Sequence, residues 1–76
     1  MIYTDSVHIV SDGEYPDELY VFAFRIGCDE LGYDRERDWW TISPTEYATA
    51  LKKGALKVTP RELRYLQKKK RMGLNL

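Results

Sequence analysis

Hydrophobic and polar positions along the chain form three short apolar runs and three longer amphipathic segments. The first two runs are rich in β-branched and aromatic residues, which is typical of strands. Asp12 and Gly13, a pair common in turns, close the first run, and Trp40 and Ile42 fall on one face of the second. The predicted strands cover residues 6–11, 39–43 and 55–58.

The first amphipathic segment follows this turn and has apolar residues at helical intervals of three and four. Pro16 suits the first position of the helix, because the N–H that proline lacks would be unpaired there in any case. Gly27 stands where a helix commonly stops. The apolar face of the predicted helix consists of Leu19, Phe22, Ala23 and Ile26.

Residues 42–54 and 58–70 share one local pattern. In each segment a hydroxyl residue, Ser43 or Thr59, precedes a proline and stands three positions before a glutamate. This is the capping box, in which hydroxyl and carboxylate satisfy free backbone N–H groups at the start of a helix. We therefore predict two further helices, each ending in lysines that suit the negative end of the helix dipole.

The resulting β-α-β-α-β-α order predicts a small single α/β domain over residues 1–76 with a short three-stranded sheet, the last few residues being disordered. About a dozen residues connect Ile42 with Ala55, as a parallel crossover requires, so parallel strand pairing is favoured. The alternative is a winged-helix-like α+β fold, since two capped helices joined by a short link resemble a helix-turn-helix. Residues 28–38 are acidic, lack a period and predict an exposed loop.

Charge is balanced over the whole chain but segregated between its halves. Residues 1–43 carry three arginines against ten acidic residues, a net charge of −7, whereas residues 44–76 carry nine bases against two acids, a net charge of +7. Such segregation indicates a surface for a polyanion or an acidic partner. It fits equally a self-complementary chain, whose acidic and basic halves pair within the fold or between the subunits of a homodimer.

One cysteine, Cys28, excludes an internal disulfide framework and a cysteine-based zinc site, and we expect an unreactive thiol near the end of a helix. The first residues lack the basic start and long apolar run of a signal peptide, and no stretch is long enough to span a membrane. We therefore expect a cytoplasmic protein. A single domain of this size has no room for a cofactor domain beside a substrate domain, and we expect no cofactor or metal.

Several segments resemble the small bacterial and phage proteins of domain-of-unknown-function family 4031. The matching stretches HIVSD, ELYVFAFRIG and ATALKKGALKVTPREL follow the order and spacing of the family over most of residues 7–66. The resemblance implies a compact cytoplasmic protein, often phage-borne, and it implies no activity, because none is assigned to the family. The matching positions are His8, Asp12, Glu18, Leu19, Phe22, Ala23, Ile26, Gly27, Ala50, Leu51, Gly54, Ala55, Thr59, Arg61, Glu62 and Leu63.

The chain departs from the family pattern at two places. Between Asp12 and the Glu-Leu pair it has two additional residues, within the stretch GEYPD. Where the second strand of the family reads His-Tyr-Asp, this chain has Trp39, Trp40 and Thr41. Two polar side chains that could complete a site with His8 are therefore replaced.

His8 and Asp12 are the candidate catalytic residues, since positions four apart on a strand point to the same side and Asp5 is close in sequence. A metal needs three or four ligands and a general base needs an orienting partner, neither of which Trp39 or Thr41 supplies. The alternative is structural: His8 lies at a sheet edge, and Asp12 bonds the backbone of its own turn.

The C-terminal helix offers a second candidate site. At 100° per residue its basic residues fall within one narrow stripe, opposite Leu63 and Leu66. Such a stripe can meet phosphates or an acidic protein surface while the helix stays packed on its domain, although a solvated charged face gives the same pattern. The predicted partner-binding residues are Arg61, Arg64, Lys68 and Arg71, with Lys52, Lys53 and Lys57 as an extension.

We therefore expect a small non-enzymatic binding or accessory protein of phage type, monomeric or homodimeric, whose basic helix contacts nucleic acid or a host or phage protein with an acidic surface. Only Tyr65 interleaves the stripe and the first half is acidic, so a protein partner fits at least as well as nucleic acid. The alternatives are a minimal metal-dependent hydrolase or nuclease-like site at His8 and Asp12, and self-association through the complementary halves.

Overall fold

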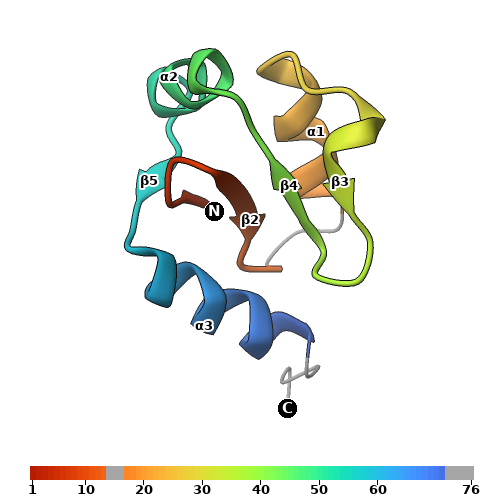
Figure 1. The fold of residues 1–76 in the computed structure, drawn as a ribbon, viewed down its shortest axis with the longest axis vertical. Coiled ribbons are helices and arrows are strands. Elements are labelled where there is room, and N and C mark those ends of the chain that lie inside the picture. Colours follow the sequence, from red (N-terminus) through yellow and green to blue (C-terminus); the bar gives the residue numbers. More distant parts are fainter. Residues whose placement is uncertain (14–16, 72–76) are drawn as a thin grey trace.

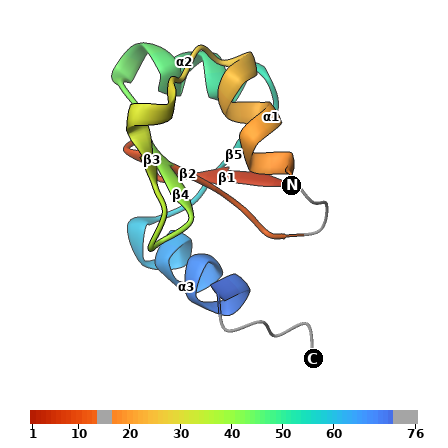
Figure 2. The ribbon, with the colours of Figure 1, turned by 90° about the vertical axis from the view of Figure 1, so that its right-hand side faces the viewer.

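The chain folds into a mixed five-stranded sheet with helices on both faces. The computed structural model describes residues 1–13 and 17–71, with every side chain in these ranges except those of residues 70 and 71. The elements are β1 (Ile2–Thr4), β2 (His8–Ser11), α1 (Glu18–Arg25), the 3-10 turn η1 (Glu30–Gly32), β3 (Tyr33–Asp34), β4 (Trp39–Thr41), α2 (Pro44–Lys52), β5 (Leu56–Lys57) and α3 (Pro60–Arg71). Figure 2 shows α1 and α2 on one face of the sheet and α3 on the other, so the sheet is the middle of three layers.

The strands lie in the order β3-β4-β2-β1-β5. β1 and β2 form an antiparallel hairpin in which Thr4 faces Ile9 and Ile2 faces Ser11. β4 is antiparallel to β2, β3 is antiparallel to β4, and β5 pairs parallel with β1. In Figure 1 the chain passes from β4 through α2 at the top to β5, and from there down into α3.

The sheet differs from the predicted one in strand count and order. We predicted three strands in β-α-β-α-β-α order, whereas the observed order is β-β-α-β-β-α-β-α. The additional strands β1 and β3 have only three and two residues, too few to show a period in the sequence. They form because a neighbouring strand offers unpaired backbone N–H and C=O groups. Residues 28–38, predicted as an exposed loop, consequently contain η1 and β3 and the half-buried Tyr33.

The predicted parallel pairing of the two strands that flank α2 is wrong. β4 and β5 run in the same direction, but β2 and β1 lie between them. β5 pairs with β1 instead, and beside this pair the N–H of Val58 donates to the carbonyl of Thr4 at 2.8 Å. The winged-helix alternative is not formed either, because β5 separates α2 from α3 and these helices cover opposite faces of the sheet (Figure 2).

The amphipathic pattern of the first helix is confirmed. Its predicted apolar face is buried, apart from the half-buried Phe22. The helix ends at Arg25, and Gly27 follows with φ 92°, a left-handed conformation that glycine adopts without strain. Two predictions, Pro16 at the first helical position and disorder of the last few residues, concern residues 16 and 72–76, which lie outside the described residues.

Both predicted capping boxes are present, at the starts of α2 and α3. Ser43 Oγ accepts a hydrogen bond from the Glu46 N–H at 3.1 Å, while Glu46 Oε1 accepts one from the Ser43 N–H at 2.9 Å. Thr59 and Glu62 make the same pair of bonds at the same distances. Each helix start is therefore fixed by local sequence, which sets where the chain leaves the sheet.

The core between the sheet and helices α1 and α2 is built around Trp40. The side chain of Trp40 is fully buried, and its Nε1 donates a hydrogen bond to the carbonyl of Asp29 at 2.9 Å. The rings of Tyr20 and Tyr33 contact the indole, with centroids 5.1 and 4.7 Å away. Gly32 permits this packing, because a Cβ at that position would lie 3.0 Å from Trp40 Cδ1.

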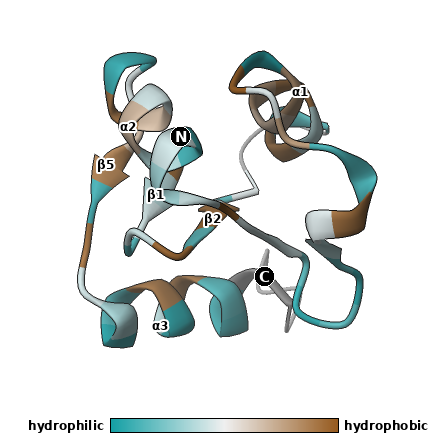
Figure 3. Cartoon of the chain, turned by 45° about the horizontal axis from the view of Figure 1, so that its top comes forward, coloured by the Kyte–Doolittle hydropathy of each residue, from teal (hydrophilic) through white to brown (hydrophobic). Residues whose placement is uncertain are grey.

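A second, smaller core lies between the sheet and α3. Because successive side chains of a strand point to opposite faces, Trp39 belongs to this core, whereas Trp40 belongs to the other with Ile42, as predicted. Figure 3 shows the corresponding pattern on α3, where hydrophobic and hydrophilic positions alternate along the helix. The buried members of this core are Val10, Trp39 and Leu63, packed against Tyr3, Val58 and Leu66.

We predict that Leu63→Ala lowers the free energy of unfolding by about 2–5 kcal/mol, because it leaves a cavity beneath α3. Leu63 is fully buried. Urea unfolding followed by tryptophan fluorescence measures the change. Leu31→Ala is the control, since Leu31 is 94% exposed and its truncation is expected to change stability by less than about 0.5 kcal/mol. Equal effects of the two substitutions would contradict the packing of α3.

Candidate functional site

The turn between β1 and β2 is closed by the side chain of Asp5. Asp5 Oδ1 accepts hydrogen bonds from the N–H groups of Val7 at 2.9 Å and His8 at 2.7 Å. Thr4 Oγ1 donates to the carbonyl of His8 at 2.8 Å and accepts from the N–H of Ser6 at 3.1 Å. These bonds fix where β2 begins, and they therefore fix the position of His8.

The ring of His8 is held on two sides. Its Nδ1 lies 3.3 Å from Asp5 Oδ2, and its plane stacks on the Trp39 indole with centroids 4.1 Å apart and planes inclined by 19°. The side chain of Asp5 is 6% exposed and that of His8 is 24% exposed. With Nδ1 facing Asp5, Nε2 is the ring nitrogen left for contacts with another molecule.

The Asp5 carboxyl is charged although it is buried. Burial raises its pKa, but the hydrogen bonds from the N–H groups of Val7 and His8, together with the His8 ring, outweigh burial and hold the pKa below its usual range. Asp5 is therefore a fixed negative charge that orients the imidazole.

A groove of about 780 Å³ lies between this part of the sheet and α3. Trp39 and Thr41 line it, and Thr41 faces His8 directly across the two paired strands. These are two of the positions at which the chain departs from the His-Tyr-Asp pattern of the family it resembles, so that departure falls within the groove. The other lining residues are Asp5, Val7, His8, Asp34, Arg37, Pro60, Arg64, Gln67 and Lys68.

Gln67 brings an unsatisfied polar group to the groove. The residue is 7% exposed, and its Nε2 is buried without a hydrogen-bond acceptor among the described residues. A buried donor without a partner costs about 1–3 kcal/mol. A polar side chain in this state calls for an explanation, and an acceptor supplied by another molecule is one.

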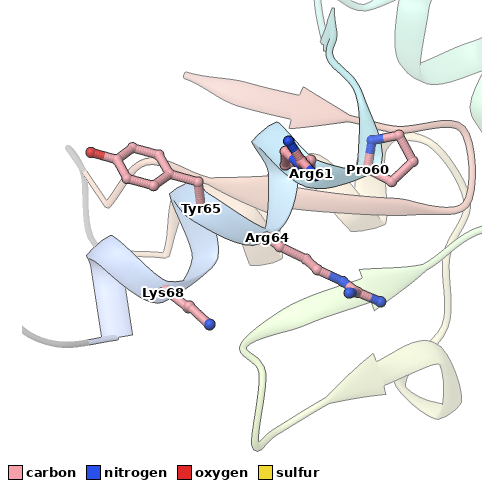
Figure 4. Close-up of a pocket in the computed structure, with 5 residues that line it drawn as sticks. All are labelled: Pro60, Arg61, Arg64, Tyr65 and Lys68. Carbon is pink, nitrogen blue, oxygen red and sulfur yellow. The ribbon is translucent and has the colours of Figure 1, made fainter.

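Arg64 and Lys68, one turn apart on α3, bring two positive charges to the groove. Neither forms an ion pair with any described residue, whereas Arg37 across the groove pairs with Asp34 at 3.0 Å. In Figure 4 the side chains of Arg64 and Lys68 extend to one side of the helix, and Tyr65 extends to the other.

Two further depressions lie along α3, outside the groove. One has a volume of about 460 Å³ and is lined by Pro60, Arg61, Arg64, Tyr65 and Lys68 (Figure 4). The other has a similar volume and is lined by Tyr3, Val58, Arg61, Glu62, Tyr65 and Leu66. Tyr65 is 64% exposed. The helix therefore presents Arg64 and Lys68 toward the groove, and Arg61 together with aromatic and apolar surface away from it.

The structure separates the two candidate catalytic residues. His8 begins β2, whereas Asp12 follows the end of that strand, where its carboxylate lies 3.4 Å from the amino group of Met1. Four strand residues correspond to about 13 Å. Asp12 does not line the groove, and the carboxylate beside His8 belongs to Asp5 instead.

The predicted partner-binding residues fall into separate regions. Arg61, Arg64 and Lys68 lie together on the exposed face of α3. Lys52 and Lys53 lie at the end of α2, on the opposite face of the sheet, and Lys57 lies in β5; none of these three lines a hollow on α3 (Figure 2). Arg71 ends α3, and its side chain is outside the described part of the chain.

The described residues offer little for metal binding or for thiol chemistry. Within residues 1–13 and 17–71, no group of three His, Cys, Asp or Glu side chains is placed to hold a metal ion. Cys28 is buried, and burial together with the nearby Glu46 raises the pKa of its thiol to about 12. The thiolate is therefore scarce at neutral pH, in agreement with the unreactive thiol expected from the sequence.

Sequence reasoning found His8 and the cations of α3 but gave no role to Trp39 or Gln67 and only a marginal one to Asp5. A signal existed for two of these. An Asp followed by small or polar residues between two strands is typical of a turn closed by its own side chain, which describes Asp5. Gln67 stands four residues after Leu63, a spacing that places both on the inner side of the helix.

We predict that Asp5→Asn lowers stability at neutral pH by about 1–2 kcal/mol, because it removes the charge that accepts the turn hydrogen bonds. The Asp5 pKa is lower in the folded than in the unfolded protein. Its contribution is therefore present above about pH 4, the usual carboxyl pKa, and is lost as the pH falls through the folded value. Urea unfolding between pH 3 and 7 tests this: the difference between wild type and variant should shrink toward low pH, and a constant difference would contradict it.

No helix among the described residues is long and apolar enough to cross a membrane.

Comparison with known protein families gives a match over most of the chain. No protein with a curated description and no solved structure matches the chain. The model of one family, described as "Protein of unknown function (DUF4031)", matches residues 4–70, a range that includes the Asp5 turn, β4 and the groove-lining part of α3. The chain therefore belongs to this family, as its sequence pattern predicted.

Proposed function

We propose that the protein is a small binding module that holds an acidic segment of a partner protein against α3. The observation that carries the proposal is the set of cations on this helix. Arg61, Arg64 and Lys68 share one exposed, hollowed face, and none of them is neutralised by a described residue. Unpaired cations on a concave surface attract carboxylates, and the attraction is strongest where the surface is partly shielded from water.

The chemistry around the cations favours a protein partner over nucleic acid. Tyr and Arg side chains are enriched at the centres of protein interfaces, and Tyr65 lines the same depression as Arg61 and Arg64. Interfaces with nucleic acid are more uniformly basic. Here the groove beside the cations contains the carboxylates of Asp5 and Asp34, which repel a continuous row of phosphates more strongly than an acidic peptide that places a single carboxylate near them.

The segregation of charge between the two halves of the chain allows a second copy of the chain to be the acidic partner. The ion pairs between described groups lie within residues 1–37, and none of them involves Arg61, Arg64 or Lys68. An acidic segment from a second copy of the chain is accordingly one form that the partner can take. The buried free thiol of Cys28 is compatible with the reducing cytoplasm that we propose as the compartment.

A second candidate function is general-base catalysis by His8. It is favoured by the Asp5 carboxylate at Nδ1, which resembles the orienting partner of a catalytic histidine, and by the neighbouring groove. The test is hydrolysis of activated esters and phosphodiesters by the purified protein. Activity that is lost in His8→Ala and kept in Asp12→Asn would support this function, and inactivity of the wild type toward both substrates would end it.

We predict that replacing Arg61, Arg64 and Lys68 together by alanine weakens binding of a polyglutamate peptide at least about tenfold at 50 mM salt, because it removes the unpaired cations. Fluorescence anisotropy of a labelled peptide measures the affinity. The control variant Lys52→Ala/Lys53→Ala removes two exposed cations from the opposite face and should leave the affinity within about twofold.

Two results would contradict the proposal. One is equal weakening by the two variants, which would indicate a nonspecific charge effect. The other is duplex or single-stranded DNA that binds more tightly than the peptide and loses affinity steeply with salt, which would identify nucleic acid as the partner.

A further inference from the structure

We propose that the groove between α3 and the β2–β4 part of the sheet is an anchor pocket for one carboxylate group. This rests on the proposed function, because the carboxylate would belong to the acidic segment that lies on α3. The proposal adds a defined subsite, a ligand class and a new residue, Gln67, to a surface otherwise identified only by its charge.

The polar groups of the groove call for an oxygen that carries negative charge. Arg64 and Lys68 supply positive charge without an intramolecular partner. Gln67 supplies an N–H donor that is buried and without an acceptor. The terminal torsion of a glutamine side chain is soft, so a small rotation can turn this N–H toward a ligand in the groove that Gln67 lines. Carboxylate oxygens accept from all three kinds of donor.

The acids that line the groove do not fill this role. Asp5 Oδ1 accepts two backbone N–H groups and its Oδ2 faces His8. Asp34 pairs with Arg37, and its Oδ1 accepts from the N–H of that residue at 3.1 Å. Both carboxylates are thus held by groups of the sheet and its turns, and neither of them pairs with Arg64 or Lys68.

The charge of the groove matches a carboxylate better than a phosphate monoester. Its lining residues include three cations, Arg37, Arg64 and Lys68, against the carboxylates of Asp5 and Asp34, a formal net charge of +1 without His8. A carboxylate carries one negative charge and balances this excess, whereas a phosphate monoester carries nearly two at neutral pH. The groove therefore matches a carboxylate.

The walls of the groove suit the rest of an acidic side chain. Val7, Trp39 and Pro60 line it beside the polar groups. Trp39 is itself fixed by stacking on His8 and by the guanidinium of Arg37, whose Cζ lies 5.9 Å from the indole centroid. The methylene groups of a glutamate can pack on these apolar surfaces while its carboxylate meets the donors. A glutamate side chain of the partner is accordingly the occupant we assign.

The sequence offers a direct reporter for the test. Gln67 is its only glutamine and Asn75 its only asparagine, so two side-chain NH2 groups account for all such signals in a ¹⁵N-correlated NMR spectrum. Gln67→Met, a change of similar size and shape, removes one of them and assigns the other. Because Gln67→Met replaces an unpaired buried amide by an apolar group, the variant should fold at least as stably as the wild type.

The experiment titrates three probes into the labelled protein: N-acetylglutamate methylamide, its uncharged glutamine analogue and inorganic phosphate. We expect a saturable shift of the Gln67 NH2 signals with the glutamate probe and none with the glutamine analogue. Arg64→Ala should weaken glutamate binding at least fivefold, and Gln67→Met, followed through backbone signals of Trp39, at least twofold. The control Lys52→Ala/Lys53→Ala should leave it unchanged.

Each contrary result has a definite meaning. Gln67 signals that stay still with the glutamate probe, or move equally with the glutamine analogue, overturn the anchor pocket. Tighter binding of phosphate than of the glutamate probe also overturns it, in favour of a phosphoryl site. If polyglutamate binds the wild type and is lost in the triple alanine variant while Gln67 does not respond, the proposed function stands and only the anchor pocket fails.

Discussion

Two adjacent tryptophans on one short strand set the requirements for the whole structure. Trp39 and Trp40 point to opposite faces of the sheet, as neighbours on a strand must, and both are buried. Each face of β4 therefore needs its own cover. The α1 and α2 layer encloses Trp40 with aromatic contacts, and α3 encloses Trp39 with a smaller set of aliphatic ones. The three-layer arrangement follows from this demand, and so does the groove, which borders the smaller of the two cores.

The elements that could be predicted from the sequence are those whose causes are local. The two capping boxes set the starts of α2 and α3, and the apolar period of α1 identifies the face that this helix buries. The strands β1 and β3 could not be found in this way, because each is defined by the backbone of a neighbouring strand. The position of β5 next to β1 has the same origin, since the hairpin occupies the places between β4 and β5.

In the candidate site, too, only the features with local causes could be predicted from the sequence. The cations of α3 were visible as a stripe, because a helix places residues on its surface by a fixed rotation. Their meeting with His8, Trp39 and Arg37 was not visible, since it depends on which face of the sheet the helix covers. The unsatisfied amide of Gln67 was hidden for a related reason: burial is a property of the packed molecule, and a glutamine among lysines and arginines gives no sign of it.

The attachment of α3 has a thermodynamic consequence. The helix follows an edge strand of two residues, and among its described side chains Leu63 alone is fully buried. Such an element can separate from the sheet at a lower free energy than global unfolding requires. A ligand that contacts α3 on one wall of the groove and the sheet on the other binds only the closed form, so it opposes this local opening by mass action. Occupancy of the groove would then be measurable as slower amide hydrogen exchange along α3.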